Sequence, residues 1–121
     1  MSLICKIHSC KDLFKPPAKT DFVAYFVARL GKQMRQSKMV KSVGNNITWD
    51  EKFMFKWANE EKLSFDIHSV NDDVICRLEV PITSSEFTGE LDIPITSLTG
   101  GRIEISYRAS DNKTPGLSEL P

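Results

Sequence analysis

The sequence predicts an all-β protein, built as an eight-stranded antiparallel β-sandwich. Two observations lead to this class. Apolar and polar residues alternate with a period of two in one short run after another, as they do over residues 63–68. No long segment repeats its apolar residues at the three- and four-residue spacing of an amphipathic helix.

The expected strands follow one another with turn residues between them. In the first strand Leu3, Cys5 and Ile7 alternate with Ile4, Lys6 and His8. The β-prone run 22–30 ends at the turn residue Gly31. The next run then pairs back on it as a hairpin. The eight runs are residues 3–8, 22–30, 33–41, 53–57, 63–68, 74–80, 91–95 and 102–108.

The domain organisation follows from the same pattern. A chain of 121 residues is the size of one domain, and we expect that domain to occupy residues 1–108. Residues 109–121 contain two prolines and no regular period, so they are expected to form a flexible C-terminal tail.

Charge is distributed unevenly along a chain whose formal net charge is zero. Residues 1–41 contain nine lysine and arginine residues against two acidic residues, whereas residues 42–121 contain seven against fourteen. Such asymmetry indicates an anionic partner for the basic half. A nucleic acid is not expected, because the chain is neutral overall and no aromatic pair of the RNA-binding RNP type lies among the basic residues.

No recognisable catalytic or cofactor motif occurs in the sequence, so we do not expect an enzyme or a cofactor. The two histidines, His8 and His68, belong to strands and are interpreted as surface or half-buried residues. Cys5, Cys10 and Cys76 are odd in number and lack metal-binding spacing. Since the chain also shows no secretory leader and no apolar run near the roughly 20 residues of a membrane span, a cytoplasmic protein with reduced thiols is expected.

The segment 45–55, Asn-Asn-Ile-Thr-Trp-Asp-Glu-Lys-Phe-Met-Phe, resembles the signature of the C2 domain family. That signature reads Asn-Pro-x-Trp-Asn-Glu-x-Phe-x-Phe, and here Ile47 replaces the proline and Asp50 the second asparagine. Residues 3–13 resemble the first strand and turn of the family, and residues 20–25 the entry to the next strand.

The resemblance covers residues 3–108 and implies the C2 sandwich. Because the first family strand already begins at residue 3, the remaining strand has to come from the far end, and residues 101–107 fit it. This order is similar to the type II topology of the C2 domains in novel protein kinases C.

Calcium-binding members of that family use about five aspartates from two loops, since calcium requires hard oxygen ligands. Asp21 matches one of these positions, but Lys15 stands where another carboxylate is needed. Asp72 and Asp73 are further weak candidates in the second loop. The resemblance therefore implies a calcium-independent domain without a metal site.

Many C2 domains bind acidic lipids through a basic hairpin, which implies peripheral docking to an anionic phospholipid membrane. The alternative is an adaptor that binds a protein partner and no lipid. The basic hairpin could also be a solvated edge that prevents aggregation, and the first-loop phenylalanine could plug the sandwich instead of inserting into lipid. The candidate lipid-binding residues are Phe14, Lys15, Lys19, Lys32, Arg35, Lys38 and Lys41.

Overall fold

The computed structural model describes residues 1–14, 20–94 and 99–110, which form nine β-strands and no helix. Within these residues, nothing has the length and apolar character of a membrane-spanning helix. The strands are β1 (Ser2–Lys11), β2 (Val23–Leu30), β3 (Gln33–Gln36), β4 (Val40–Lys41), β5 (Ile47–Lys56), β6 (Lys62–Ser69), β7 (Val74–Pro81), β8 (Glu86–Asp92) and β9 (Arg102–Ser110).

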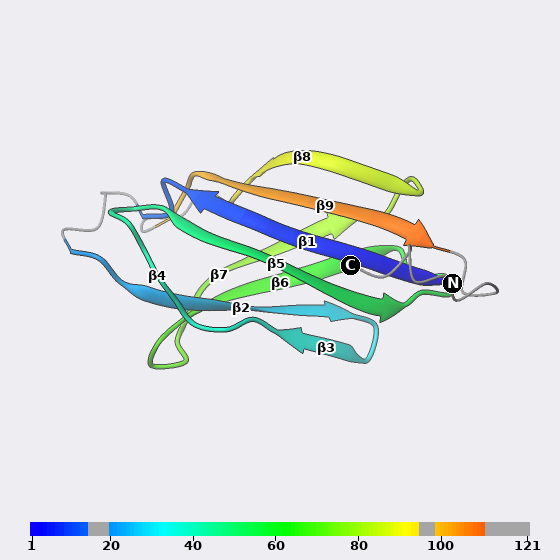
Figure 1. Ribbon diagram of the computed structural model, residues 1–121, viewed down its shortest axis with the longest axis horizontal. Helices are drawn as coiled ribbons and strands as arrows, with labels where there is room; N and C mark the ends of the chain where they lie inside the picture. Colours follow the sequence, from blue (N-terminus) through cyan, green and yellow to red (C-terminus); the bar gives the residue numbers. More distant parts are fainter. Residues whose placement is uncertain (15–19, 95–98, 111–121) are drawn as a thin grey trace.

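The strands form two antiparallel sheets that face each other, which confirms the predicted β-sandwich (Figure 1). In the first sheet the order is β5-β1-β9-β8. In the second it is β3-β2-β6-β7, and β4 pairs with another part of β2. The strand β9 lies between β1 and β8, so the two ends of the described chain meet in the middle of one sheet. Assignment to the type II topology stays a prediction.

The nine strands differ from the eight expected ones at several places. The first strand continues to Lys11, and β5 begins at Ile47, six residues before the expected run 53–57. The run 33–41 is interrupted and forms both β3 and β4 on β2. The strand expected at 91–95 overlaps β8 only at Leu91 and Asp92, because β8 begins at Glu86 and ends at Asp92; residue 95 lies outside the described residues. The early part of β8 escaped notice because Gly89 and acidic residues leave few apolar side chains in it, and the strand stops before Pro94, which has no N–H for a sheet. Finally, Ala109 and Ser110 belong to β9 and not to a tail; residues 111–121 lie outside the described part.

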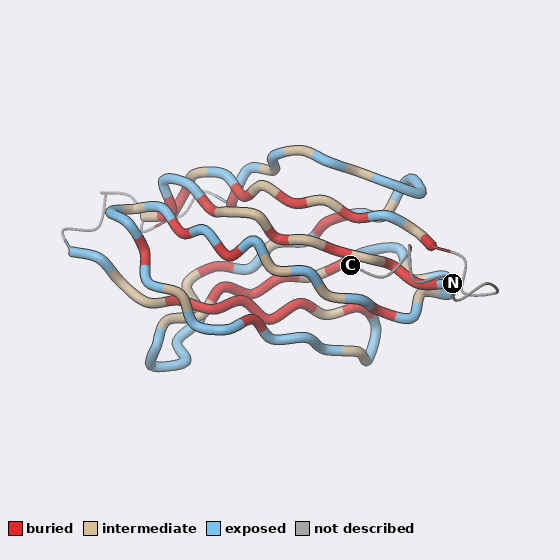
Figure 2. The backbone as a smooth tube through the Cα atoms, in the orientation of Figure 1, coloured by how far each residue is buried: buried red, intermediate tan, exposed pale blue. Residues whose placement is uncertain are grey.

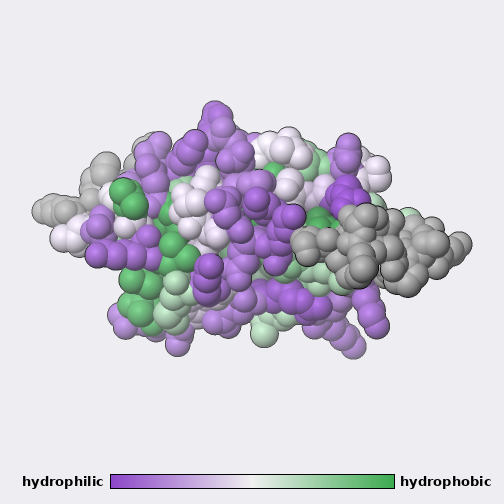
Figure 3. All heavy atoms as spheres, in the orientation of Figure 1, coloured by the Kyte–Doolittle hydropathy of each residue, from purple (hydrophilic) through white to green (hydrophobic). Residues whose placement is uncertain are grey.

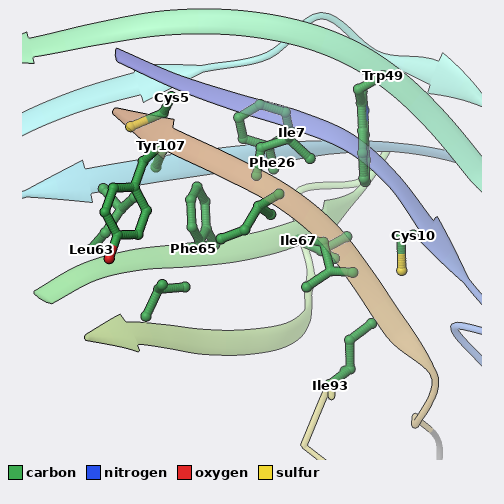
Figure 4. Packing of buried hydrophobic residues seen from close by; sticks show 14 of the residues in the cluster. Cys5, Ile7, Cys10, Phe26, Trp49, Leu63, Phe65, Ile67, Ile93 and Tyr107 are labelled. Carbon is green, nitrogen blue, oxygen red and sulfur yellow. The ribbon is translucent and has the colours of Figure 1, made fainter. Parts of the chain in front are cut away.

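The core between the sheets comes from alternate residues of facing strands (Figures 2 and 4). Figure 4 shows Ile7 and Trp49 of the first sheet facing Phe26, Phe65 and Ile67 of the second. Trp49 is only 3% exposed. Further core residues that are buried are Ala24, Phe26, Phe55, Leu63, Phe65 and Ile67. Another set is half-buried and packs against the core: Phe22, Phe53 and Trp57.

Strand β1 changes its inward face at His8. The register with both neighbouring strands shifts between Ile7 and Ser9, as at a β-bulge. Before the bulge the odd-numbered residues Leu3, Cys5 and Ile7 are buried, and after it the even-numbered Cys10 is buried. Lys6, which alternates with the buried Cys5 and Ile7, and His8, at the bulge itself, therefore lie on the solvent side of the first sheet.

Candidate functional site

The basic hairpin lies along one long side of the sandwich, where β3 of the second sheet approaches β5 of the first. Side chains of the hairpin bridge the two strands. The Gln33 carboxamide donates from Nε2 to the Lys56 carbonyl at 2.6 Å and accepts the Lys56 N–H at 2.8 Å. Arg35 Nε donates to the Met54 carbonyl at 3.1 Å. The side of the sandwich formed by β3, β4 and β5 is therefore closed by side chains.

Two serine hydroxyls hold the hairpin to β2 where its backbone ladder is incomplete. Ser37 Oγ accepts the N–H of Phe26 at 2.9 Å, and Ser42 Oγ accepts the N–H of Phe22 at 2.8 Å. Both serines are buried. Since a buried N–H needs an acceptor, these hydroxyls take the place of backbone carbonyls and let the chain bend outward between β3 and β4. Lys38 sits at this bend.

We call Lys32, Arg35, Lys38 and Lys41 the basic edge. Lys32 occupies the turn after Gly31, and Lys41 belongs to β4. All four residues are exposed, and none forms an ion pair with a described residue. Arg35 differs from the lysines because its guanidinium carbon lies 5.1 Å from the centre of the Phe55 ring, a cation–π distance, in addition to its bond with Met54. Arg35 therefore has a structural role, whereas the three lysines are free to contact a partner.

Exposed apolar side chains accompany these cations. Met34 is 56% exposed and Met39 50% exposed, and both come from the same hairpin. Val43, in the turn that follows, is 81% exposed. The basic edge thus combines unpaired positive charge with apolar groups that water solvates poorly. Sequence reasoning identified the cations but missed the methionines, because their exposure depends on where the hairpin bends.

The first-loop residue Phe14 is packed and not free. Its ring meets Phe22 edge-on at a centroid distance of 4.8 Å. Its backbone is held from both sides by Asn45, whose Oδ1 accepts the Phe14 N–H at 3.0 Å and whose Nδ2 donates to the Phe14 carbonyl at 2.9 Å. This geometry corresponds to the plug that we considered as the alternative to lipid insertion. Lys15 and Lys19 lie outside the described residues.

Two of the three carboxylates considered for calcium accept hydrogen bonds from distant parts of the chain. Asp21 Oδ1 accepts the N–H of Gly44 at 2.8 Å, and Asp72 Oδ1 accepts the Tyr25 hydroxyl at 2.6 Å. Asp73 is exposed, and its carbonyl accepts the N–H of Ser69. No group of three or more candidate metal ligands is present among the residues that the structure describes. Calcium independence stays a prediction.

Sequence reasoning missed a charged cluster on the outer face of the second sheet. Asp66 of β6 is buried, and its carboxylate lies 2.6 Å from Arg29 Nη1 and 3.6 Å from Arg77 Nε. The ring of His68 stacks on Tyr25 at a centroid distance of 5.0 Å. The signal for this cluster is the pairing of Asp66 with both Val27 and Arg77 in the strand register, and that register is not readable from one sequence.

The cysteines are poor nucleophiles in this setting. All three are free and buried, and burial raises the pKa of Cys5 and of Cys10 to about 12 and that of Cys76 to about 11. A thiol with such a pKa is almost entirely protonated near neutral pH, and the thiolate is the reactive form. Cysteine chemistry is therefore not a function for which these residues are suited.

The architecture defines a class of protein, an antiparallel β-sandwich, here with a basic and partly apolar edge exposed to solvent. The family model of the C2 domain matches residues 1–109, and the chain belongs to the C2 domain family. C2 domains are generally binding modules without catalysis.

Comparison with solved structures shows the same fold. A C2 domain-containing protein from a putative elicitor-responsive gene superposes with a TM-score of 0.75 at 14% identity, covering 94% of this chain and 91% of its own. A single C2 domain of plant extended synaptotagmin 1 gives 0.71 at 14% identity, covering 92% and 96%. A structure of extended synaptotagmin 2 that holds two C2 domains gives 0.69 at 18% identity, and 88% of this chain spans 38% of that one. A search of curated protein sequences found no match.

Proposed function

We propose that this C2 domain is a non-enzymatic module that docks peripherally, and without calcium, on anionic phospholipid membranes through its basic edge. One observation carries the proposal: Lys32, Lys38 and Lys41 are exposed and without ion pairs among the described residues, and exposed methionines lie beside them. Cations attract an anionic leaflet, and apolar side chains gain free energy by leaving water at its surface.

The affinity of the basic edge for an anionic membrane can be estimated from its exposed side chains. A lysine near an anionic leaflet contributes about 1 kcal/mol, so the three unpaired lysines supply about 3 kcal/mol. Each half-exposed methionine adds on the order of 1 kcal/mol if it becomes buried. A total of about 5 kcal/mol corresponds to a dissociation constant in the sub-millimolar range. Docking by this domain alone is therefore weak and reversible, and it depends on every member of the edge.

Vesicle sedimentation tests the proposal. The chain should bind vesicles of phosphatidylcholine and phosphatidylserine in chelator at low salt, and it should leave them as salt rises, because exposed charges are screened within about 10 Å at 0.1 M. The double variant Lys32→Glu, Lys38→Glu should lose binding while keeping its melting temperature. Arg35 is left intact because its contacts with Met54 and Phe55 hold the sandwich together.

A matched control reverses one charge at a distance from the edge. Arg102 of β9 lies two strands away from β5 in the first sheet, is exposed and forms a surface ion pair with Asp92. Arg102→Glu should keep most of its vesicle binding, whereas Lys38→Glu, which changes the net charge equally, should lose much of it. Equal loss in both single variants would show that only net charge matters. Absence of binding to any anionic vesicle would favour the adaptor, in which the same edge contacts an acidic protein surface.

A further inference from the structure

A second set of basic residues gathers on the outer face of the first sheet, away from the basic edge. The strand register places Lys6 of β1 directly between Lys52 of β5 and Ser106 of β9. Ser106 in turn lies opposite Thr88 of β8. Their chain neighbours Cys5, Phe53 and Tyr107 point into the core, so by the alternation of a strand this row of four side chains points to solvent.

The next row along the sheet supplies a third cation. Arg108 of β9 lies between Ile4 of β1 and Glu86 of β8. The two rows together surround a hollow of about 220 Å³ whose polar lining residues are Lys6, Lys52, Glu86, Thr88, Ser106 and Arg108. Figure 3 looks onto this side of the molecule and shows a mainly hydrophilic surface over the centre of the sheet.

The charges in the hollow do not balance. Lys6 and Lys52 are direct cross-strand neighbours, and like charges in that position destabilise a sheet. Neither lysine nor Arg108 forms an ion pair with any residue in the described ranges, and Glu86 is the one carboxylate of the described lining. A sheet face that keeps three cations beside one anion is stabilised when an external anion enters between them.

The donors around the hollow specify the kind of anion. Lysine, arginine and hydroxyl donors suit an acceptor with several oxygens and more than one negative charge, which describes a phosphate group. The Ser106 hydroxyl is held in place by His8, whose Nε2 lies 3.3 Å from Ser106 Oγ. The volume of the hollow is more than ten times the roughly 10–15 Å³ that a cavity needs to hold one water molecule, so a phosphate group fits.

We propose that this hollow binds a phosphomonoester group, through Lys6, Lys52 and Arg108 as the cations and Ser106 and Thr88 as hydroxyl donors. The group can belong to a free phosphate ester or to the headgroup of a lipid, and the chemistry of recognition is the same. This site is separate from the basic edge, and it stands whether or not that edge docks on membranes.

Because Lys6 and Lys52 repel each other, removing one of them should have two opposite effects, one on thermal stability and one on phosphate affinity. In phosphate-free buffer of low ionic strength, Lys52→Gln removes a like-charge contact and should raise the melting temperature above that of the original chain. Inorganic phosphate should stabilise the original chain more than sodium chloride of equal ionic strength. In Lys52→Gln the affinity for phosphate should fall about fivefold, as expected for one lost lysine–anion contact. A merely structural lysine would not produce both effects.

Amide chemical shifts locate the site and two further variants control for charge. Phosphate should shift resonances around Lys6, Lys52, Ser106 and Arg108. The edge variant Lys38→Gln should bind phosphate as the original chain does, and Glu86→Gln should bind it more tightly. Shifts spread evenly over all basic residues, or an equal response to phosphate and chloride, would overturn the proposal.

Vesicles distinguish the two sources of the group. Phosphatidic acid carries a phosphomonoester and phosphatidylserine does not. If a lipid headgroup occupies the hollow, the chain should prefer phosphatidic acid vesicles, and Lys52→Gln should remove that preference. If free phosphate binds at the hollow and the two vesicles are bound alike, the ligand is a free phosphate ester. If the original chain binds phosphate and phosphatidic acid vesicles no more tightly than Lys52→Gln does, the proposed site is refuted.

Discussion

The hydroxyl of Ser37 should contribute far more to stability than its size suggests. The Phe26 N–H that it accepts is buried in the core, and the Phe26 carbonyl on the same side of β2 accepts the Ser37 N–H, so both groups are directed at Ser37. The change Ser37→Ala leaves the N–H unpaired, and a buried unsatisfied donor costs about 1–3 kcal/mol. At about 4 °C per kcal/mol for a chain of this length, the melting temperature should fall by roughly 4–12 °C.

Thermal unfolding followed by circular dichroism measures this loss, and Ser84→Ala is the matched control. Ser84 also donates its hydroxyl hydrogen to a backbone carbonyl, that of Glu86, but it is exposed. Its loss should change stability by no more than about 0.5 kcal/mol. If Ser37→Ala and Ser84→Ala have the same melting temperature, the Ser37 hydroxyl does not substitute for a backbone acceptor. Our account of how the hairpin bends at Lys38 is then wrong.

Two other predictions concern the backbone and the core. Gly101 has φ +83°, and a Cβ there would overlap the Lys11 carbonyl oxygen, so Gly101→Ala should severely destabilise the domain. Gly44 has φ +62° but open space around it, so Gly44→Ala should cost only about 1–2 kcal/mol. Equal denaturation midpoints of the two variants would contradict this prediction. At pH 8 a thiol reagent should react only slowly with the native chain, because burial raises the pKa of Cys5, Cys10 and Cys76. After unfolding it should label all three thiols quickly. Rapid labelling of the native chain would show that the thiols are not protected by burial.

Local alternation was enough to predict the sandwich because both sheets have one face on the core. It placed Leu63, Phe65 and Ile67 correctly inside. It failed at β8, an edge strand in which only Phe87 and Leu91 are apolar and both are half-buried. An edge strand contacts the core on one side and a single neighbour, so its sequence is under weaker apolar constraint. The bulge at His8 was also invisible, because an extra residue changes register without changing composition.

The sequence predicted which residues belong to the basic edge, but not which of them contact a partner and which stabilise the fold. The sequence indicated that Lys32 and Lys38 belong to a basic hairpin, and the structure places both in solvent. It could not separate Arg35 from them, because the contacts of Arg35 are with β5, a strand far along the chain. The Lys6–Lys52 pair escaped for the same reason: each lysine alone is an ordinary polar residue of an alternating strand, and only their register makes them neighbours.

The two hydrogen bonds between the Gln33 side chain and the Lys56 backbone affect how copies of the domain can associate through the edge of β5. A carboxamide that both donates to and accepts from one residue does what the peptide group of an incoming strand would do. With the Met54 carbonyl also occupied by Arg35, three backbone groups along the rim of β5 are already satisfied within the molecule. Molecules gathered on a two-dimensional surface collide far more often than molecules in dilution. A rim capped in this way lets neighbouring copies meet there without joining their sheets into a continuous fibril.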